Sequence, residues 1–220
     1  MSEIPSFDDF RAVFLNYTRK TFDVLPKIPK PRILDIGCGT GVVTIELASL
    51  TDGEILGMDI DQKALNKLNE KIREKGLSDQ ITTQYGSLLK SGLKRESFDI
   101  IWAEGVIHII GFKNGFKACH ELLKPDGFLV LAEAIVGMNR NLDLITKSGF
   151  DLYNQIDWEK MCWWTKFYAP LEKTLKRLRD EGIRPDLYAE LRSHEGEISM
   201  VRNNLNESDC AHYILKKVKV

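Results

Sequence analysis

The chain has 220 residues, 43% of them hydrophobic, which is enough to bury the core of a single domain spanning residues 1–220. Its 31 basic and 32 acidic residues give a formal net charge of -1, which excludes a global electrostatic attraction to nucleic acid or an anionic membrane. The four cysteines form no C-x-x-C pair, no apolar run has the length of a membrane span, and the polar start Ser2–Phe10 is unlike a signal peptide. We therefore expect a cytoplasmic protein with a small-molecule partner and no metal site; its oligomeric state stays open.

The first 30 residues predict an N-terminal helical arm. Ser6 can cap a helix whose first turn carries Asp8 and Asp9. Aromatic side chains then repeat at helical spacing, at Phe7, Phe10, Phe14 and Tyr17. The pattern favours a helix that packs on the rest of the domain through its aromatic face, before a proline-rich stretch ends it.

A glycine-rich turn follows the arm. The apolar run within Arg32–Ile36 predicts the end of a buried strand, and the spacing of apolar residues within Val42–Leu50 predicts a helix. Three glycines lie between them, at positions 37, 39 and 41. Glycine lets the backbone turn sharply and brings a ligand against bare main chain, so this stretch is typical of a nucleotide-binding turn.

The charge beside the turn indicates the kind of nucleotide. Asp35 directly precedes the turn, and Val42 stands where a pyrophosphate-binding G-x-G-x-x-G turn has its third glycine. A carboxylate here would repel a pyrophosphate, which disfavours a nicotinamide-dependent oxidoreductase. It suits a ligand with a cationic end, such as the ammonium and sulfonium groups of S-adenosylmethionine.

The order D-x-G-x-G-x-G, formed by Asp35 and the three glycines, resembles the first motif of the class I S-adenosylmethionine-dependent methyltransferases. The resemblance extends over residues 32–133 and includes the phrase L-L-K-P-D-G-F-L at Leu122–Leu129. It implies an α/β fold: a Rossmann-like, doubly wound, mostly parallel sheet with helices on both faces. The terminal strand, expected at Cys210–Lys217, would be antiparallel.

In such methyltransferases an N-terminal helix often closes over the cofactor. The resemblance therefore implies that Tyr17 and Arg19 lie near the methionine end of the cofactor. It likewise places the residues of the turn against the cofactor, namely Asp35, Gly37, Cys38, Gly39 and Gly41. The alternative for the arm is simple packing on the domain, with no role in binding.

Two further strand ends complete the expected cofactor site. Asp59 ends a strand that begins at Glu54 and lies 18 residues after Gly41, where a carboxylate usually accepts hydrogen bonds from a ribose. The resemblance places Ile60 against the adenine. It also implies adenine contacts from Ser87 and the backbone amide of Leu88, although the family often has Asp where Ser87 stands.

The fourth strand, Phe98–Trp102, leads to the candidate catalytic residues. Glu104 follows its carboxyl end. Methyltransferases that act on amide or base nitrogens carry the Asn of an N-P-P-Y motif at this position. That motif is absent here, which argues against amide and base nitrogens as methyl acceptors. Glu104 and His108 are four residues apart and would share a face of a helical turn, where the pair could bind the acceptor or take its proton. Alternatively, Glu104 holds the amino end of the cofactor and His108 is structural.

The phrase Trp102–Gly105 resembles a subgroup of uncharacterised small methyltransferases with a Trp-x-Glu-Gly phrase.

Beyond the fifth strand, expected at Gly127–Glu133, residues 137–205 predict a mostly helical cap and C-terminal region. Residues 137–169 are irregular and rich in aromatic side chains, which could form a substrate cap or a helix packed on the sheet. Pro170 opens a clear helix. We expect the sixth strand to be short or missing.

The function implied by the resemblance is transfer of the methyl group of S-adenosylmethionine to an unidentified small-molecule acceptor, releasing S-adenosylhomocysteine. An alternative of another class is a cofactor-binding regulator or partner subunit without turnover. An open pocket beside the expected methyl position, with Glu104 turned into it, would favour the enzyme.

Overall fold

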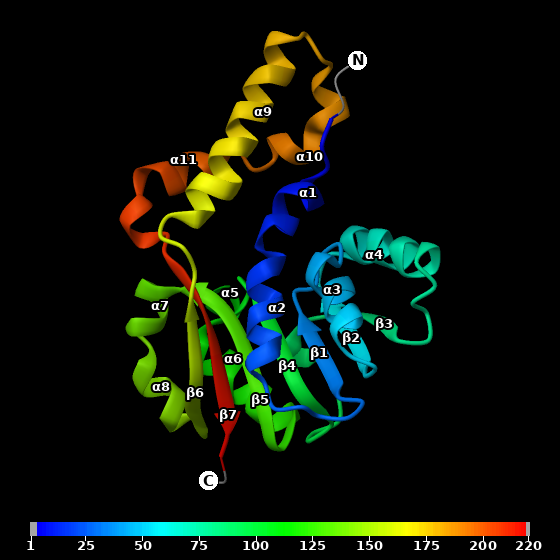
Figure 1. Cartoon of the computed structure of the whole chain (residues 1–220), viewed down its shortest axis with the longest axis vertical. Helices are drawn as coiled ribbons and strands as arrows, with labels where there is room; N and C mark the ends of the chain where they lie inside the picture. The colour runs from blue at the N-terminus through cyan, green and yellow to red at the C-terminus, as the bar shows by residue number, and fades with distance from the viewer. Residues whose placement is uncertain (1–3, 219–220) are drawn as a thin grey trace.

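The computed structural model describes residues 4–218, which form a seven-stranded sheet with helices on both faces (Figure 1). The strand order is β3-β2-β1-β4-β5-β7-β6. The strands are β1 (Arg32–Ile36), β2 (Glu54–Asp59), β3 (Ile81–Tyr85), β4 (Phe98–Glu104), β5 (Leu123–Ala134), β6 (Phe150–Asp157) and β7 (Cys210–Lys217). The reversal of strand order between β1 and β4 creates the switch point at which open α/β sheets bind ligands. The expected α/β fold is confirmed.

The terminal strand is antiparallel, as the sequence predicts. β7 pairs antiparallel with both β5 and β6, whereas the other pairs are parallel. The expectation of a short or missing sixth strand is wrong, because β6 has eight residues. Most of its side chains are exposed, since β6 lies at the sheet edge, and so it lacks the apolar run that marks the central strands.

Helices cover the sheet in two layers, each with its own core. One layer contains α2 (Leu15–Val24), α3 (Val42–Leu50) and α4 (Gln62–Glu74), which pack around Ile33, Ile100 and Trp102. The other contains α5 (Ile107–Ile110), α6 (Phe112–Leu122), α7 (Ile135–Asn139) and α8 (Leu142–Lys147). Side chains alternate between these cores along each strand, as a two-sided sheet requires. The short helix η2 (Leu88–Lys90) follows β3.

The N-terminal arm and a cap formed by the helical segment before β7 meet beyond the carboxyl ends of the parallel strands (Figure 1). The N-terminal arm is made of α1 (Phe7–Arg11), η1 (Ala12–Phe14) and α2, and the predicted Ser6 cap is present. The cap comprises η3 (Trp163–Tyr168), α9 (Ala169–Asp180), η4 (Pro185–Tyr188), α10 (Ala189–Arg192), α11 (Glu195–Asn203) and η5 (Leu205–Glu207). Arm and cap share a third hydrophobic cluster that includes Phe14, Trp158 and Phe167. The aromatic residues of segment 137–169 therefore bind the cap to the arm.

Within residues 4–218, no helix combines the length and apolarity needed to cross a membrane. The organisation of residues 1–220 as one domain stays a prediction, and residues 1–3 and 219–220 of that range lie outside the described part of the chain.

Candidate functional site

The glycine turn between β1 and α3 has the backbone geometry that the sequence predicts. Gly37, Gly39 and Gly41 have φ angles of +69°, +52° and +87°, a region that side chains with a Cβ rarely adopt. The amides of Gly37 and Cys38 donate to the carbonyl of Met58, which ties the turn to the end of β2. A Cβ added at Gly39 would meet nothing within 4 Å, so open space borders the turn at this residue.

Asp35 lies beneath the turn and is 2% exposed. Its Oδ2 accepts a hydrogen bond from the Thr44 hydroxyl at 2.6 Å, which links β1 to the first turn of α3. Burial raises the pKa of Asp35 to about 7, although the bond from Thr44 opposes the rise. A cation bound nearby would favour the ionised form.

Glu104 ends β4, and its side chain is 6% exposed. Its Oε1 accepts hydrogen bonds from Trp102 Nε1 at 2.8 Å, Thr18 Oγ1 at 3.1 Å and His212 Nε2 at 3.2 Å. Arg11 lies 3.9 Å from Oε2. Burial alone would raise the pKa of Glu104, but the interactions with His212, Arg11 and Trp102 lower it overall. Glu104 is therefore a fixed, ionised carboxylate.

The hydrogen bonds of His212 define its tautomer. Trp158 Nε1 donates to His212 Nδ1 at 3.2 Å, and an indole nitrogen can only donate. The proton of the neutral ring is thus on Nε2, which donates to Glu104. His212 is fully buried and comes from β7, so the terminal strand contributes directly to the position of Glu104.

A cavity of about 430 Å³ lies between the glycine turn, the arm and the cap. Predicted residues in its lining are Asp35, Gly37, Cys38, Gly39 and Glu104. The arm contributes Phe7 and Arg11, and the cap contributes Glu190, Ser193 and His194. The site is consequently enclosed by elements from both ends of the chain.

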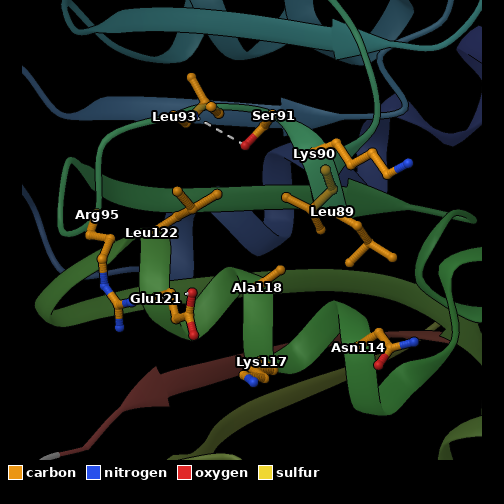
Figure 2. Close-up of a pocket in the computed structure, with 12 residues that line it drawn as sticks. Leu89, Lys90, Ser91, Leu93, Arg95, Asn114, Lys117, Ala118, Glu121 and Leu122 are labelled. Carbon is orange, nitrogen blue, oxygen red and sulfur yellow. Dashed lines mark hydrogen bonds and ion pairs between the residues drawn. The ribbon is translucent and has the colours of Figure 1, made fainter.

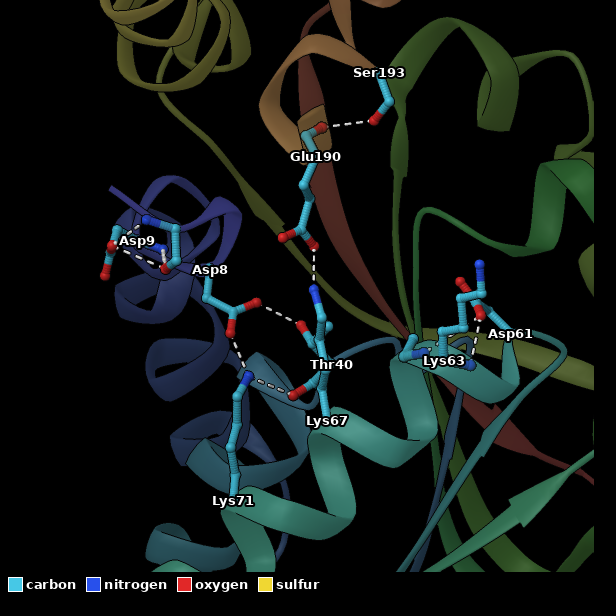
Figure 3. Close-up of polar contacts among 11 residues, drawn as sticks. Asp8, Asp9, Thr40, Asp61, Lys63, Lys67, Lys71, Glu190 and Ser193 are labelled. Carbon is cyan, nitrogen blue, oxygen red and sulfur yellow. Dashed lines mark hydrogen bonds and ion pairs between the residues drawn. The ribbon is translucent and has the colours of Figure 1, made fainter. Parts of the chain in front are cut away.

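Polar contacts hold the arm and the cap over the turn (Figure 3). The Asp8 carboxylate accepts hydrogen bonds from Thr40 in the turn and from Lys71 on α4. Lys71 also donates to the Thr40 carbonyl at 2.8 Å. One turn earlier on α4, Lys67 pairs with Glu190 of the cap at 2.8 Å. α4 therefore holds both the arm and the cap.

The arm lies at the cavity, but not through the predicted residues. Tyr17 stacks on Trp158 with ring centroids 4.6 Å apart, and its hydroxyl accepts from the Glu159 amide. Arg19 pairs with Glu46 on the surface of α3. Neither is among the described residues that line the cavity, and their contact with the cofactor stays a prediction. Arg11 and Phe7, about two and three turns before Tyr17, line the cavity instead.

Asp59 lies at the end of β2, next to the turn. Its Oδ2 accepts from the Gly39 amide at 2.7 Å and its Oδ1 from the Asp61 amide at 2.8 Å. Asp61 caps α4, as expected.

Burial raises the pKa of the Cys38 thiol, so Cys38 is a neutral packing residue within the turn.

The residues predicted at the adenine follow neighbouring strands. Asp59 is in register with Tyr85, so Ile60 and Ser87 come just after the adjacent ends of β2 and β3. Ile60 is 69% exposed, whereas Leu88 is buried. Their contacts with adenine stay predictions.

His108 is paired with Glu133 rather than Glu104. Its Nδ1 lies 2.8 Å from Glu133 Oε2, and this hydrogen bond raises the pKa of His108. The predicted helical face shared by Glu104 and His108 is wrong, because Glu104 is the last residue of β4 and α5 begins at Ile107. A catalytic role of His108 stays a prediction.

A second hollow of about 460 Å³ lies between η2 with its following loop and α6 (Figure 2). Its lining includes Lys90, Arg95 and Lys117, and Ser91 accepts a hydrogen bond from the Leu93 amide beside it. The glycine turn and the Asp35 and Glu104 carboxylates are not part of its described lining. The cavity at the turn is therefore the candidate site.

Comparison with known proteins identifies the site. The family model described as a methyltransferase domain matches residues 33–127, which contain β1, the turn and β4. Residues 33–127 therefore form a methyltransferase domain of the class I S-adenosylmethionine-dependent family. S-adenosylmethionine is the cofactor of this family. Among curated relatives, 27-O-demethylrifamycin SV methyltransferase of Amycolatopsis mediterranei is 27% identical over 135 residues, or 59% of this chain and 50% of that protein.

Solved structures share the fold over nearly the whole chain. Phosphoethanolamine N-methyltransferase 2 of Haemonchus contortus, in complex with S-adenosylmethionine, has a TM-score of 0.70 and 14% identity over 98% of this chain and 61% of that one. The [4+2]-cyclase SpnF has a TM-score of 0.75 and 17% identity over 93% of this chain and 82% of that one. The chain spans about half the length of the curated relatives it matches.

The residues of the cavity fit the cofactor of the family. Its sulfonium and ammonium groups are cationic, and both Asp35 and Glu104 line the cavity. Bare main chain at Gly39 borders open space, and the Gly39 amide donates to Asp59, which is not among the described residues that line the cavity, so its contact with a ribose stays a prediction. Among residues 4–218, no group of three or more His, Cys, Asp or Glu side chains is placed to hold a metal ion.

Proposed function

We propose that this methyltransferase transfers the methyl group of S-adenosylmethionine to a small molecule bound in the cavity between the turn, the arm and the cap. The observation that carries the proposal is the cavity lined by the glycine turn, the Asp35 and Glu104 carboxylates, the arm and the cap. The bound cofactor supplies an already activated methyl group. Catalysis then depends mainly on alignment of the acceptor and exclusion of water, which an enclosed cavity favours.

The residues have separate roles in this proposal. Asp59 accepts hydrogen bonds from the ribose, and Asp35 and Glu104 balance the positive charge of the cofactor. The depressed pKa of Glu104 makes it a weak proton acceptor, so we assign it to charge balance and orientation rather than to acid–base chemistry. Ile60, Ser87 and Leu88 contact the adenine.

The nature of the acceptor follows from charge and from the relatives. A net charge of -1 offers nucleic acid no global attraction, and the first relative is named as a methyltransferase of 27-O-demethylrifamycin SV. We propose a dissolved small molecule as the acceptor. Four buried free cysteines are consistent with a reduced cytoplasmic setting.

The experiment is a turnover assay that measures S-adenosylhomocysteine released from S-adenosylmethionine across fractionated metabolite pools. The proposal predicts release above the protein-free blank in at least one fraction. Asp59→Ala, which removes the ribose contact, should abolish that release. Binding of S-adenosylhomocysteine without turnover in any fraction would favour the regulator or partner subunit instead.

A further inference from the structure

A histidine and a glutamate of the cap form a pair beside the cavity. His194 lines the same cavity as Gly39 and Glu104, and its side chain is 21% exposed. Its partner, Glu197, lies one turn further along in α11. Neither residue belongs to the methyltransferase motifs at residues 32–133.

The hydrogen bond within the pair defines where the imidazole can take a proton. His194 Nδ1 lies 3.1 Å from Glu197 Oε2, and this bond lowers the pKa of Glu197, so the carboxylate accepts and Nδ1 carries the hydrogen. Nε2 of the neutral ring then has a free lone pair. No hydrogen bond from residues 4–218 reaches this nitrogen. A carboxylate prepares an imidazole for proton abstraction in the same way in hydrolytic triads.

Packing fixes the orientation of the pair. The Phe7 ring stacks on the His194 ring with centroids 4.0 Å apart and an interplanar angle of 8°. The Tyr168 hydroxyl donates to the same Glu197 oxygen at 3.4 Å. The imidazole is thus held from the arm and from η3, which meets the need for a preorganised catalytic group.

Arg11 connects this pair to Glu104. Its guanidinium lies 3.9 Å from Glu104 Oε2 and 4.9 Å from the Trp163 ring centroid, and its charge also acts on Glu197. The Arg11 guanidinium therefore acts on the carboxylate at the end of β4 and on the His194–Glu197 pair, and Arg11, Glu104 and His194 line the same cavity.

Two other imidazoles, those of His108 and His212, are less suited to take a proton from a molecule in the cavity. His212 already donates its Nε2 proton to Glu104. His108 is paired with Glu133. Glu104 is in register with Ala132, so these two side chains share one face of the sheet. Glu133, the next residue along β5, therefore projects to the opposite face from Glu104. His108 is also not among the described residues that line the cavity.

We propose that His194, oriented by Glu197, is the catalytic base and that the methyl acceptor is a hydroxyl compound. This inference rests on the proposed methyl transfer. The acceptor proton passes to His194 Nε2, and an oxygen electron pair forms the bond to the methyl carbon. The carbon–sulfur bond breaks with its pair on sulfur, and His194 later releases the proton to water.

Among the charged side chains of the cavity lining, Arg11 favours oxygen over the other acceptors that need a base, whereas Asp35 and Glu104 balance the charge of the cationic cofactor. Arg11 stabilises negative charge that develops on oxygen, and it repels a protonated amine. A thiol ionises more readily and has less need of a base. Hydroxyl groups, above all phenols and enols, are therefore the expected acceptors.

The first experiment compares the wild type with His194→Gln, Glu197→Gln and the matched control Glu195→Gln on a panel of phenols, alcohols, amines and thiols. Glu195 lies on the same helix, pairs with Arg179 and Arg192 and is not among the described cavity residues. We expect hydroxyl methylation by the wild type and by Glu195→Gln. His194→Gln should lower kcat by about 10²–10⁴-fold while S-adenosylhomocysteine affinity stays within about threefold.

The second experiment needs no turnover. Nitrogen-15 NMR of the neutral imidazoles, assigned by His194→Gln, should show the Nδ1–H tautomer for His194 and the Nε2–H tautomer for His212. An Nε2–H tautomer at His194 would overturn the proposal, as would full activity of His194→Gln or a wild type that methylates only thiols or amines. A wild type that binds S-adenosylhomocysteine and methylates nothing would overturn the proposed function, and this inference with it.

Discussion

Asp35 is a buried carboxyl group whose charge depends on what binds above it. Its pKa of about 7 in the folded protein exceeds the ordinary value, because burial disfavours the ionised form. The raised pKa stabilises the cofactor-free fold at low pH. This contribution is present below about pH 4 and is lost as the pH rises through about 7.

Asp35→Asn tests this behaviour without cofactor. We expect the wild type to lose unfolding free energy relative to Asp35→Asn between pH 4 and 8, by at most a few kcal/mol, since each pKa unit corresponds to about 1.4 kcal/mol. Urea unfolding of both proteins across this range measures the difference. A difference that does not change with pH would show that Asp35 keeps one charge state throughout.

Glu104→Gln separates charge from hydrogen bonding at the end of β4. The amide oxygen can still accept from Trp102 and His212, but the negative charge beside the cofactor is gone. Affinity for S-adenosylmethionine should fall by about 10–150-fold, the equivalent of about 1.5–3 kcal/mol for an interaction with a charged group. The neutral sulfur of S-adenosylhomocysteine should lose less.

Calorimetry with both ligands measures this difference, and Glu46→Gln, which removes only the surface partner of Arg19, is the control. Equal losses for the two ligands would contradict a charge-balancing role for Glu104.

Among the individual site residues, the sequence predicted those that are close together in the chain. Asp35, the three glycines and Asp59 lie in one motif or at its expected distance, so their placement follows from strand and turn patterns. Arg11, His194 and His212 could not be predicted, because strand register and the position of the cap bring them to Glu104. For Tyr17 and Arg19, helical spacing predicted a buried face but not which turn of the arm reaches the cavity.

Among the elements, α3 and α4 approach each other closely at Gly41. A Cβ added there would lie 2.1 Å from Leu68 Cδ1, and the residue has a φ of +87°. Gly76, after α4, has a φ of +66° and nothing within 4 Å of an added Cβ. The two glycines thus differ in crowding while sharing the backbone constraint.

Gly41→Ala should therefore lower the free energy of unfolding by about 2–5 kcal/mol, from left-handed strain together with overpacking. Gly76→Ala should lower it by about 1–2 kcal/mol, from strain alone. Urea unfolding measures both. Similar losses for the two variants would contradict the close approach of α3 and α4.

Strands and helices were predictable where periodicity was strong. β1 and α3 have the expected bounds because β1 is buried on both faces and α3 carries apolar residues at helical spacing. β6 was missed because an edge strand alternates weakly, and Leu152 and Tyr153 remain exposed. Its pairing with β7 is a long-range contact that local sequence does not encode.

For the whole molecule, the site forms where residues 7–11 of the arm and residues 190–194 of the cap meet the glycine turn. α4 holds both through Lys71 and Lys67 (Figure 3). A ligand in the cavity must therefore either enter while these contacts are open or bind before they form. The resemblance over residues 32–133 predicted the cofactor but not this enclosure.

The central claim is that the cavity binds a cationic sulfur nucleoside and excludes a pyrophosphate. Isothermal titration calorimetry of the whole chain with S-adenosylmethionine, S-adenosylhomocysteine and NAD tests it most directly. We predict saturable binding of both sulfur nucleosides, weakened in Asp59→Ala, and no heat of binding with NAD. Saturable binding of NAD without affinity for either sulfur nucleoside would contradict the account.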